Sequence, residues 1–282
     1  MKSLLAFFAK RYIAGTERKD AIEAARRLGS IGILATIDHL GENVKNPSEA
    51  QAVADEYLSL LDEIKTSNVD STVSLKLTHL GLDISNELAE KNAGKIIEKA
   101  LLHNNFVRFD MEGSAYTQRT IDIFLKLREK HPNVGIAIQS CLYRSRADME
   151  LLIKKGASVR LIKGAYKEPP DIAFKDKKDV DKSFEVLMKE LLLKGNRPAI
   201  ATHDLRLINE AIKFVRENNI PKDCFEFQML LGIKRTLQKK LANEGYRMRV
   251  YVPYGKDWLP YTMRRLMERK ENVFFVVRNI FD

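Results

Sequence analysis

The sequence predicts an α/β protein of the (β/α)8 barrel class, and three observations support this prediction. Short runs rich in Val, Ile, Leu or Phe recur eight times along the 282 residues. Longer amphipathic stretches separate these runs, which is the pattern of βαβ units around a parallel sheet. No GxGxxG motif follows the first run, and this disfavours an open nucleotide-binding sheet.

The predicted strands share their short length and their apolar, mostly β-branched or aromatic character. In chain order they are IGILATI (31–37), TVSLKL (72–77), FVRFDM (106–111), VGIAIQ (134–139), SVRLIK (158–163), PAIAT (198–202), CFEFQ (224–228) and RMRVYV (247–252). Helix-like stretches fill the intervals, for example 47–65 from PSEA, 85–102 from SNEL, and 179–194. Between them, KDKKDVDK (175–182) alternates in charge, which we interpret as a solvated loop.

One barrel domain is expected to span residues 1–282, with residues 1–28 as an N-terminal helical extension. The opening MKSLLAFFAKRYIAG has only LLAFFA as its apolar core and no small-residue cleavage site before charges resume. This pattern favours a short amphipathic helix over a secretory signal. Its expected role is packing against the barrel, with peripheral membrane contact as the alternative.

Composition narrows the class of protein. The net charge of +10 is compatible with nucleic-acid binding, but 38 acidic residues are interleaved with the basic ones and no basic tail occurs, so we expect no nucleic-acid partner. No uncharged apolar run reaches the about 18 residues of a membrane-spanning helix. The two cysteines, Cys141 and Cys224, form no CxxC motif and lie near no histidine cluster, so neither a disulfide framework nor a metal site is expected. We expect a cytoplasmic protein, with peripheral contact at the inner face of the membrane as the alternative.

Polar residues occupy the end of nearly every predicted strand or follow it directly, and in a barrel these strand ends meet at one mouth, where barrel enzymes place their chemistry. They are Asp38, Lys76, Asp110 with Glu112, Gln139, Arg160 with Lys163, Thr202 with His203 and Asp204, Gln228, and Tyr251. A purely structural barrel has little reason to collect so many polar groups there. The sequence therefore predicts a functional site at the carboxyl-terminal mouth.

Lys76 alternates with Leu75 and Leu77, so its side chain is expected inside the barrel with Asp110 as a partner. It is a candidate ligand of a carboxylate or a candidate Schiff-base amine, and a structural ion pair is the alternative. Asp110 and Glu112 form a carboxylate pair, although Glu112 is also placed to cap the next helix. For His203, a hydrogen-bonding role is favoured over metal binding because no second histidine lies at metal-ligand spacing.

Two further motifs point to ligand binding. In RLIKGAY (160–166), Arg160 and Lys163 flank a strand end that runs into Gly164 and Ala165, where small residues permit close approach of a large flat or phosphorylated ligand. In YTMRRLMER (261–269), Tyr261, Arg264, Arg265 and Glu268 share one helix face and form a candidate anion clamp. An ordinary solvated helix face is the alternative for the second motif.

Together these motifs resemble the proline dehydrogenase family in its monofunctional bacterial form, over roughly residues 30–278. The resemblance rests on SLKLTHLGLDI (74–84), VRFDMEGSAYTQRT (107–120), IAIQSCLYRS (136–145), VRLIKGAYKEP (159–169), ATHD (201–204), FEFQMLLGI (225–233), RVYVPYG (249–255) and YTMRRLMER. Eight such motifs in order, at compatible spacing, are far more specific than any one of them.

The resemblance implies a distorted barrel that holds non-covalent FAD and oxidises L-proline to Δ1-pyrroline-5-carboxylate, the first step of proline catabolism to glutamate, with a quinone as electron acceptor. It implies that Lys76, Arg264 and Arg265 hold the substrate carboxylate, that Asp110 and Arg160 lie closest to the chemistry, and that Tyr166, Leu230, Tyr251 and Tyr261 wall the substrate ring. It assigns flavin binding to Met111, Gln139, Arg160, Lys163, Gly164, Ala165, Thr202, His203 and Gln228, and assigns Glu268 to the support of the clamp at the cofactor site.

One departure and two alternatives accompany this reading. Family members often place an acidic gate residue before the first strand, whereas this chain has AKRYIAGTER there, with Glu17 displaced. A barrel lyase or aldolase with a Schiff-base Lys76 or Lys163 would need no flavin. A basic nucleic-acid-binding protein, from a different class, would explain the net charge but not the polar strand ends.

Overall fold

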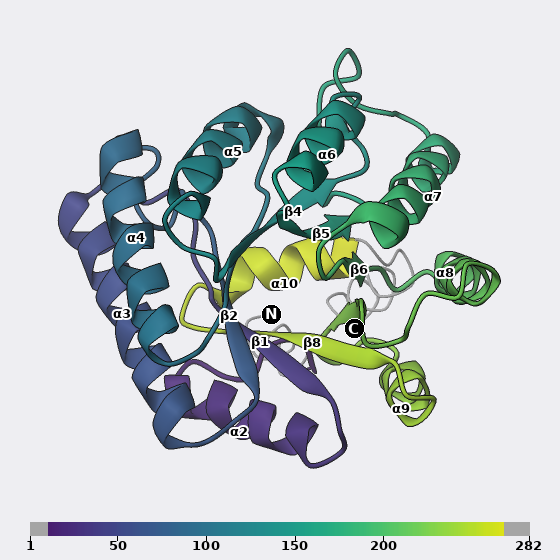
Figure 1. Cartoon of the computed structure of the whole chain (residues 1–282). Coiled ribbons are helices and arrows are strands. Elements are labelled where there is room, and N and C mark those ends of the chain that lie inside the picture. Colours follow the sequence, from purple (N-terminus) through teal and green to yellow (C-terminus); the bar gives the residue numbers. More distant parts are fainter. Residues whose placement is uncertain (1–10, 268–282) are drawn as a thin grey trace, which may run out of the picture.

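The computed structural model describes residues 11–267 (Figure 1), and its eight strands close into one parallel barrel in the order of the sequence. Every strand pairs in parallel with its chain neighbours, and β1 pairs with β8 to close the ring. The strands are β1 (Leu34–His39), β2 (Ser71–Leu75), β3 (Val107–Phe109), β4 (Val134–Gln139), β5 (Ser158–Ile162), β6 (Ala199–Ala201), β7 (Glu226–Leu230) and β8 (Arg247–Tyr254). All eight predicted strands are thus confirmed.

Helices surround the barrel and connect successive strands (Figure 1). They are α2 (Arg18–Gly29), α3 (Pro47–Thr66), α4 (Asn86–Leu102), α5 (Ser114–Arg128), α6 (Ser145–Lys154), α7 (Lys177–Lys194), α8 (Leu205–Glu217), α9 (Arg235–Asn243) and α10 (Trp258–Met267). Their starts are encoded locally. The Asn46 side chain accepts the Ser48 N–H at 2.9 Å ahead of Pro47 in α3, and the Ser85 hydroxyl accepts the Leu88 N–H at 3.1 Å in α4.

The barrel is distorted at its closing unit, as expected. The helix that follows β8 would ordinarily pack outside the ring, but α10 crosses the middle of the ring in Figure 1. Its place against β1 and β8 is taken by α2, the N-terminal helix, which contacts both strands. Helix α10 therefore covers a mouth of the barrel, and α2 completes the wall.

Side chains alternate across the sheet as the period of two requires. In β2, Val73 and Leu75 are completely buried in the apolar layer under the helices, where each such side chain stabilises the fold by about 1.5–3 kcal/mol. Ser74 and Lys76 have the opposite parity and bond to polar groups of other strands. Because the interior carries polar side chains, each needs a partner, and these partners build the site described below.

The interpretation of KDKKDVDK as a loop is wrong for most of its length. Lys177 begins α7, and the preceding Asp176 has the extended backbone of an N-cap residue. Asp179 lies in the first turn, where a carboxylate is favoured by the helix dipole. The alternating charges therefore mark the solvated start of a helix. The predicted helix at the extreme N-terminus, residues 1–10, lies outside the described residues. Among residues 11–267, the structure contains no helix of the length and apolar character needed to cross a bilayer.

Candidate active site

A cavity of about 480 Å³ opens at the carboxyl-terminal mouth of the barrel. It collects expected site residues from six strands or the turns that follow them, and from α10. These are Lys76, Asp110, Met111, Arg160, Lys163, Gly164, Ala165, Tyr166, Thr202, His203, Gln228, Leu230, Tyr251 and Tyr261. Residues that are scattered over 186 positions of the sequence numbering (76 to 261) thus line one space.

The remaining expected residues fall beside this cavity or outside the described part. Gln139 is buried at the end of β4 and approaches the cavity through the turn at Gly164. Arg264 and Arg265 belong to α10 by their backbone, but their side chains lie outside the described part, as does Glu268 altogether. Within residues 11–263, no group of three or more His, Cys, Asp or Glu side chains is arranged to hold a metal ion.

Lys76 is held between two carboxylates. Its Nζ donates to both carboxylate oxygens of Asp38 at 3.0 Å and lies 3.7 Å from Asp110 Oδ2. The expected pairing with Asp110 is confirmed, and Asp38 proves to be the closer partner. The parallel register brings Asp38 opposite Ser74, which places its carboxylate next to the residue two positions further on.

The charges of this group are set by burial and mutual attraction. Burial raises the pKa of Asp38 to about 6, against the opposing effect of the Lys76 ammonium, so the carboxylate is ionised at neutral pH. Burial alone lowers the pKa of Lys76, but Asp38 and Asp110 outweigh it and the net shift is upward. Lys76 therefore remains a cation, which suits an anion ligand and not an amine nucleophile.

Asp110 is the centre of a second set of short hydrogen bonds. It accepts from Arg160 Nη1 and from the Tyr251 hydroxyl, each at 2.6 Å. Burial raises the pKa of Tyr251 well above its usual value, and the charge of Asp110 adds to this, so the phenol remains a donor. The Arg160 guanidinium also lies over the Tyr251 ring, 5.5 Å from its centroid.

Arg160 uses its remaining donors to fix its own orientation. Its Nε donates to Gln228 Oε1 at 2.6 Å, and its Nη2 donates to Ser74 Oγ at 3.0 Å. The guanidinium is therefore bonded at once to β2, to β7 and to Asp110 directly after β3. Such fork geometry cannot be reproduced by lysine.

The turn after β5 provides an open cradle of backbone. Gly164 has a φ of +115°, and a Cβ at this position would collide with the Cys141 Sγ. The same Cβ would lie 3.3 Å from Gln139 Oε1, a buried acceptor without a hydrogen-bond partner in the described part of the chain. A flat ligand with an N–H group fits both observations, because it can lie against glycine backbone and satisfy the amide oxygen.

Lys163 is held at the edge of this turn by two carboxylates. Its Nζ lies 2.5 Å from Asp181 Oδ1 and 2.9 Å from Asp204 Oδ2. On the next unit, His203 accepts the Leu230 N–H through Nε2 at 2.9 Å, which confirms a hydrogen-bonding histidine. That bond connects the end of β6 to the end of β7.

An apolar cluster covers one side of the mouth. It contains Tyr12 and Ile13 from the N-terminal segment, Leu40, Ile233, and Tyr261 of α10. Gly232 has a φ of +77°, and a Cβ on Gly232 would collide with the carbonyl oxygen of Arg11. The segment before α2 and the last helix therefore close over the cavity together, while Glu17 serves as the N-cap of α2.

Glu112 does not cap the next helix, whose N-cap is Gly113. Its carboxylate is buried and accepts from both the backbone N–H and the hydroxyl of Thr78. Burial raises the pKa of Glu112 to about 7, with the Thr78 hydrogen bonds opposing the shift. The helix start is instead bonded to Glu168, which accepts the Ser114 N–H at 3.0 Å.

Sequence reasoning missed three features of this site. It recognised Asp38 as a strand-end residue but not as the partner of Lys76. The only feature of the sequence that could have indicated this pairing is that the two residues end consecutive strands, which are neighbours in a barrel. It placed Lys177, which lines the cavity, and Asp181, which binds Lys163, in a solvated loop. A helical reading of 177–194, with Asp181 one turn after Lys177, would have placed both on one face.

Comparison with known proteins gives consistent results. A sequence model of the family described as "Proline dehydrogenase" matches residues 21–278. Proline dehydrogenase 1 of Bacillus subtilis (strain 168) is 42% identical over 272 residues, covering 96% of this chain and 90% of the relative. A proline dehydrogenase of Deinococcus radiodurans is 39% identical over 277 residues, covering 96% and 89% respectively.

Among solved structures, the chain resembles proline utilization A from Bdellovibrio bacteriovorus, determined after inactivation by N-propargylglycine. The TM-score is 0.87 at 27% identity, and the match covers 93% of this chain. It covers 33% of that protein, so the chain spans about a third of the length of this structural relative.

Proposed function

The chain belongs to the proline dehydrogenase family of oxidoreductases, and from this premise we propose that it oxidises L-proline to Δ1-pyrroline-5-carboxylate with a non-covalent FAD as hydride acceptor. The observation that carries the proposal is the cavity at the carboxyl-terminal mouth, which joins a cationic Lys76, a carboxylate–arginine pair and a glycine turn in one space.

Lys76, Arg264 and Arg265 are proposed to hold the substrate carboxylate. Lys76 is cationic and faces the cavity, and α10 carries both arginines over the mouth. Guanidinium forks match a carboxylate in a planar, bidentate manner. Tyr166, Leu230, Tyr251 and Tyr261 would wall the pyrrolidine ring, since all four line the same cavity.

The flavin ring is proposed to lie against the turn formed by Lys163, Gly164 and Ala165. When bound, the flavin supplies the acceptor for the hydride that leaves the ring carbon next to nitrogen. The buried Gln139 oxygen would accept from it, and Lys163, held by Asp181 and Asp204, would lie at its edge. Met111, Arg160, Thr202, His203 and Gln228 would complete the contacts, with Glu268 supporting the clamp.

Asp110 and Arg160 are proposed to organise the reacting end of the cavity. Their 2.6 Å bond, together with the Tyr251 hydroxyl on the same carboxylate, fixes three polar groups at one place. The substrate nitrogen must lose its proton before hydride can leave, because its lone pair forms the C=N bond. Nearby cations favour the neutral amine, so the charge of the pocket lowers the cost of that deprotonation.

A quinone is proposed as the final electron acceptor, because the family resemblance implies one. The Schiff-base alternative is disfavoured at Lys76, since a Schiff base requires a neutral amine and both neighbouring carboxylates hold this lysine charged. Borohydride trapping of substrate on a lysine would support that alternative.

The proposal is tested by denaturing the purified protein, identifying the released flavin by chromatography, and measuring proline-dependent reduction of an artificial electron acceptor. We expect released FAD and reduction that requires L-proline. Recovery of FMN would overturn the choice of FAD, and absence of any flavin after reconstitution would overturn the function. A yellow preparation would also argue against both the lyase and a nucleic-acid-binding protein.

A further inference from the structure

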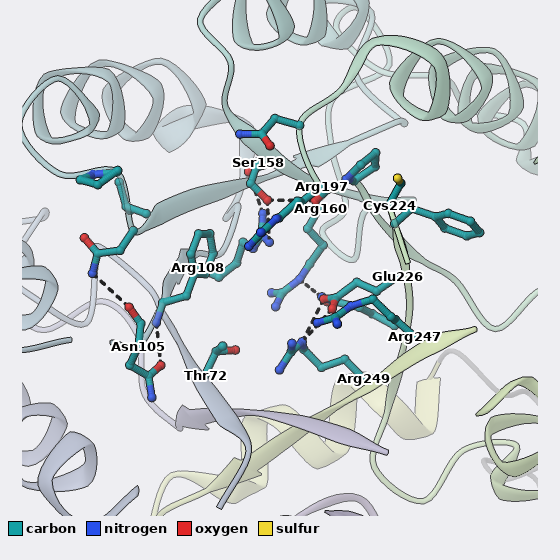
Figure 2. A pocket seen from close by; sticks show the side chains of 18 of the residues that line it. Thr72, Asn105, Arg108, Ser158, Arg160, Arg197, Cys224, Glu226, Arg247 and Arg249 are labelled. Carbon is teal, nitrogen blue, oxygen red and sulfur yellow. Dashed lines mark hydrogen bonds and ion pairs between the residues drawn. The ribbon is translucent and has the colours of Figure 1, made fainter. Parts of the chain in front are cut away.

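A second and larger cavity, of about 810 Å³, opens at the amino-terminal mouth of the barrel. Its lining comes from the first residues of the strands and the turns that precede them, at the opposite end from the candidate active site. Figure 2 shows Arg108 of β3 on one side of it and Glu226, Arg247 and Arg249 of β7 and β8 on the other. Arg160 and Gln228 line both cavities and separate this one from the candidate active site.

Arginine dominates the charge of this cavity. Six arginines line it, and two of them are neutralised by carboxylates. Arg160 binds Asp110 at 2.6 Å on the active-site side, and Arg249 binds Glu226 at 2.9 Å. The other four are Arg108, Arg128, Arg197 and Arg247, and the lining offers them one further carboxylate, Asp223.

Arg108 lies at the base of the cavity and is 5% exposed. Its Nη1 donates to the Ser158 carbonyl at 2.7 Å and its Nη2 to the Ser158 hydroxyl at 3.2 Å, while its guanidinium lies 5.0 Å from the centroid of the Phe106 ring. In the described part of the chain it forms no ion pair within 4.0 Å. Burial, with help from Arg160 and Arg249, lowers the pKa of Arg108 to about 9. The cation is therefore held in an unfavourable field that an anion would relieve.

Arg128 adds an independent sign of a missing partner. Its Nη2 donates to the Gly156 carbonyl at 3.1 Å, but its buried Nε has no hydrogen-bond partner among the described residues. Arg197 and Arg247 are exposed at the edge of the cavity, where a ligand from solvent would meet them first. The buried Arg108, the half-buried Arg128 and the exposed Arg197 and Arg247 therefore present guanidinium groups from the base of the cavity to its entrance.

We propose that the amino-terminal mouth binds a small polyvalent oxyanion that carries phosphate or carboxylate groups. The four arginines without an ion pair among the described residues keep N–H donors beyond those already bonded to Ser158 and Gly156, and both phosphate and carboxylate oxygens accept from such donors. The excess of positive charge in the lining favours a ligand with more than one negative charge. The volume is large enough for a molecule bigger than a single phosphate ion, which places the site in the size range of metabolite pockets of about 300–1,000 Å³.

Calorimetric titration of the full chain with inorganic pyrophosphate and with citrate tests the proposal and separates its two sources. We expect at least one probe to bind with a Kd below about 1 mM, more weakly as salt is added. Arg247→Gln should weaken that binding by at least about fivefold, because one charge-assisted bond is lost at a partly solvated site. Arg197→Gln, also at an exposed position, provides a second variant of the same kind.

The matched control is Arg146→Gln, which removes the same charge from an exposed arginine at the start of α6, outside the cavity lining. It should leave the affinity unchanged. Binding of pyrophosphate alone or citrate alone assigns the ligand class. No binding of either probe, or equal weakening by the Arg146 variant, overturns the proposal and leaves the arginines as charges that only brace the barrel.

Cys224 provides a second readout that does not involve catalysis. This exposed thiol lines the cavity, whereas Cys141 lies at the other mouth and burial raises its pKa to about 11, which slows alkylation. The neutral reagent iodoacetamide should modify Cys224 several-fold more slowly when the cavity is occupied by the bound probe. At a probe concentration near the wild-type Kd, protection should be clearly weaker in Arg247→Gln, because a smaller fraction of the cavity is occupied. Modification of Cys224 at one rate with and without a bound probe would place the anion elsewhere and refute the assignment.

Discussion

At the scale of single residues, replacing Lys76 should affect both stability and substrate binding, because its ammonium balances a buried carboxylate and faces the cavity. Lys76→Met leaves Asp38 fully buried without its cation, so we expect a loss of about 3–5 kcal/mol in the free energy of unfolding. If Lys76 binds the substrate carboxylate as proposed, the same variant should also raise the Michaelis constant for proline by at least about tenfold.

The two effects separate in the double variant Lys76→Met with Asp38→Asn. Removing the buried negative charge should restore most of the stability, measured by urea unfolding, while the affinity for proline stays low. If the double variant recovers both stability and the wild-type Michaelis constant, Lys76 is a structural cation only.

Glu112 predicts a distinctive dependence of stability on pH. Its pKa is raised to about 7 in the folded protein from an ordinary value of 4.5, so the native state binds a proton that the unfolded state releases between these values. Stability from this group is therefore present at low pH and is lost as pH rises through that window, by roughly 3 kcal/mol at most. Glu112→Gln mimics the protonated acid: its amide oxygen can accept the Thr78 N–H, its amide NH2 can donate to the Thr78 hydroxyl oxygen, and it has no proton to lose.

Urea unfolding at about pH 5 and about pH 7.5 checks this sign. We expect Glu112→Gln to gain stability relative to wild type at the higher pH, while Asp38, raised in the same direction, contributes equally to both proteins. Glu129→Gln, a change at an exposed carboxylate after α5, is the matched control and should track wild type. Parallel curves for Glu112→Gln and wild type would contradict the buried titration.

At the scale of elements, local pattern and tertiary register contribute differently. Runs such as VGIAIQ predicted their strands because a strand buried on both faces must be apolar throughout. The pairing of Lys76 with Asp38 was not predictable in this way, since 38 residues and a whole helix separate them and only the β1–β2 register joins them. The start of α7 was misread because alternating charge signals solvation, which a loop and a helix terminus share.

The turn after β5 yields a prediction about backbone. Gly164→Ala introduces both a left-handed strain of about 1–2 kcal/mol and a collision with Cys141, so we expect a marked loss of flavin per mole of protein. Gly156→Ala is the control for a positive φ without a collision, because Gly156 has a φ of +65° and open space around its Cβ position. Flavin absorbance at equal protein concentration measures both. A full complement of flavin in Gly164→Ala would show that the turn is not the cradle.

Helix α10 carries the prediction for the clamp. Tyr261 lines the cavity, and Arg264 and Arg265 follow it at three and four residues, on the same helix face. Arg→Met at either position should raise the Michaelis constant for proline by at least about tenfold with flavin still bound, because a hydrogen bond to a charged group is lost. Arg265→Met should have the larger effect, because Glu268 follows Arg265 at a sequence spacing of three residues, which favours an ion pair on a helix. Unchanged kinetics in both variants would support the alternative, in which this helix face is solvated and binds no substrate.

At the scale of the described molecule, the barrel interior forms one polar path between its two mouths. Lys76 and Asp110 lie at one end, Arg160 and Gln228 in the middle, and Glu226 with Arg249 at the other. Sequence pattern identified the carboxyl-terminal half of this path because strand ends are visible in a sequence. It did not identify the amino-terminal half, since Arg108 and Arg249 lie within strands and their convergence depends on closure of the whole ring.

That dependence on closure gives the last prediction. Residues proposed to contact flavin come from β3 to β7 and the turns after them, so the binding surface exists only while the barrel is closed through β1 and β8. Flavin should therefore leave in the same transition that destroys the helices, and saturating FAD should raise the melting temperature by about 5 °C or more. Flavin fluorescence and far-ultraviolet circular dichroism, recorded on one sample during heating, check both points. Release of flavin well below the loss of helical signal would mean that its site opens locally, through the covering formed by α10 and the segment before α2, without unfolding of the ring.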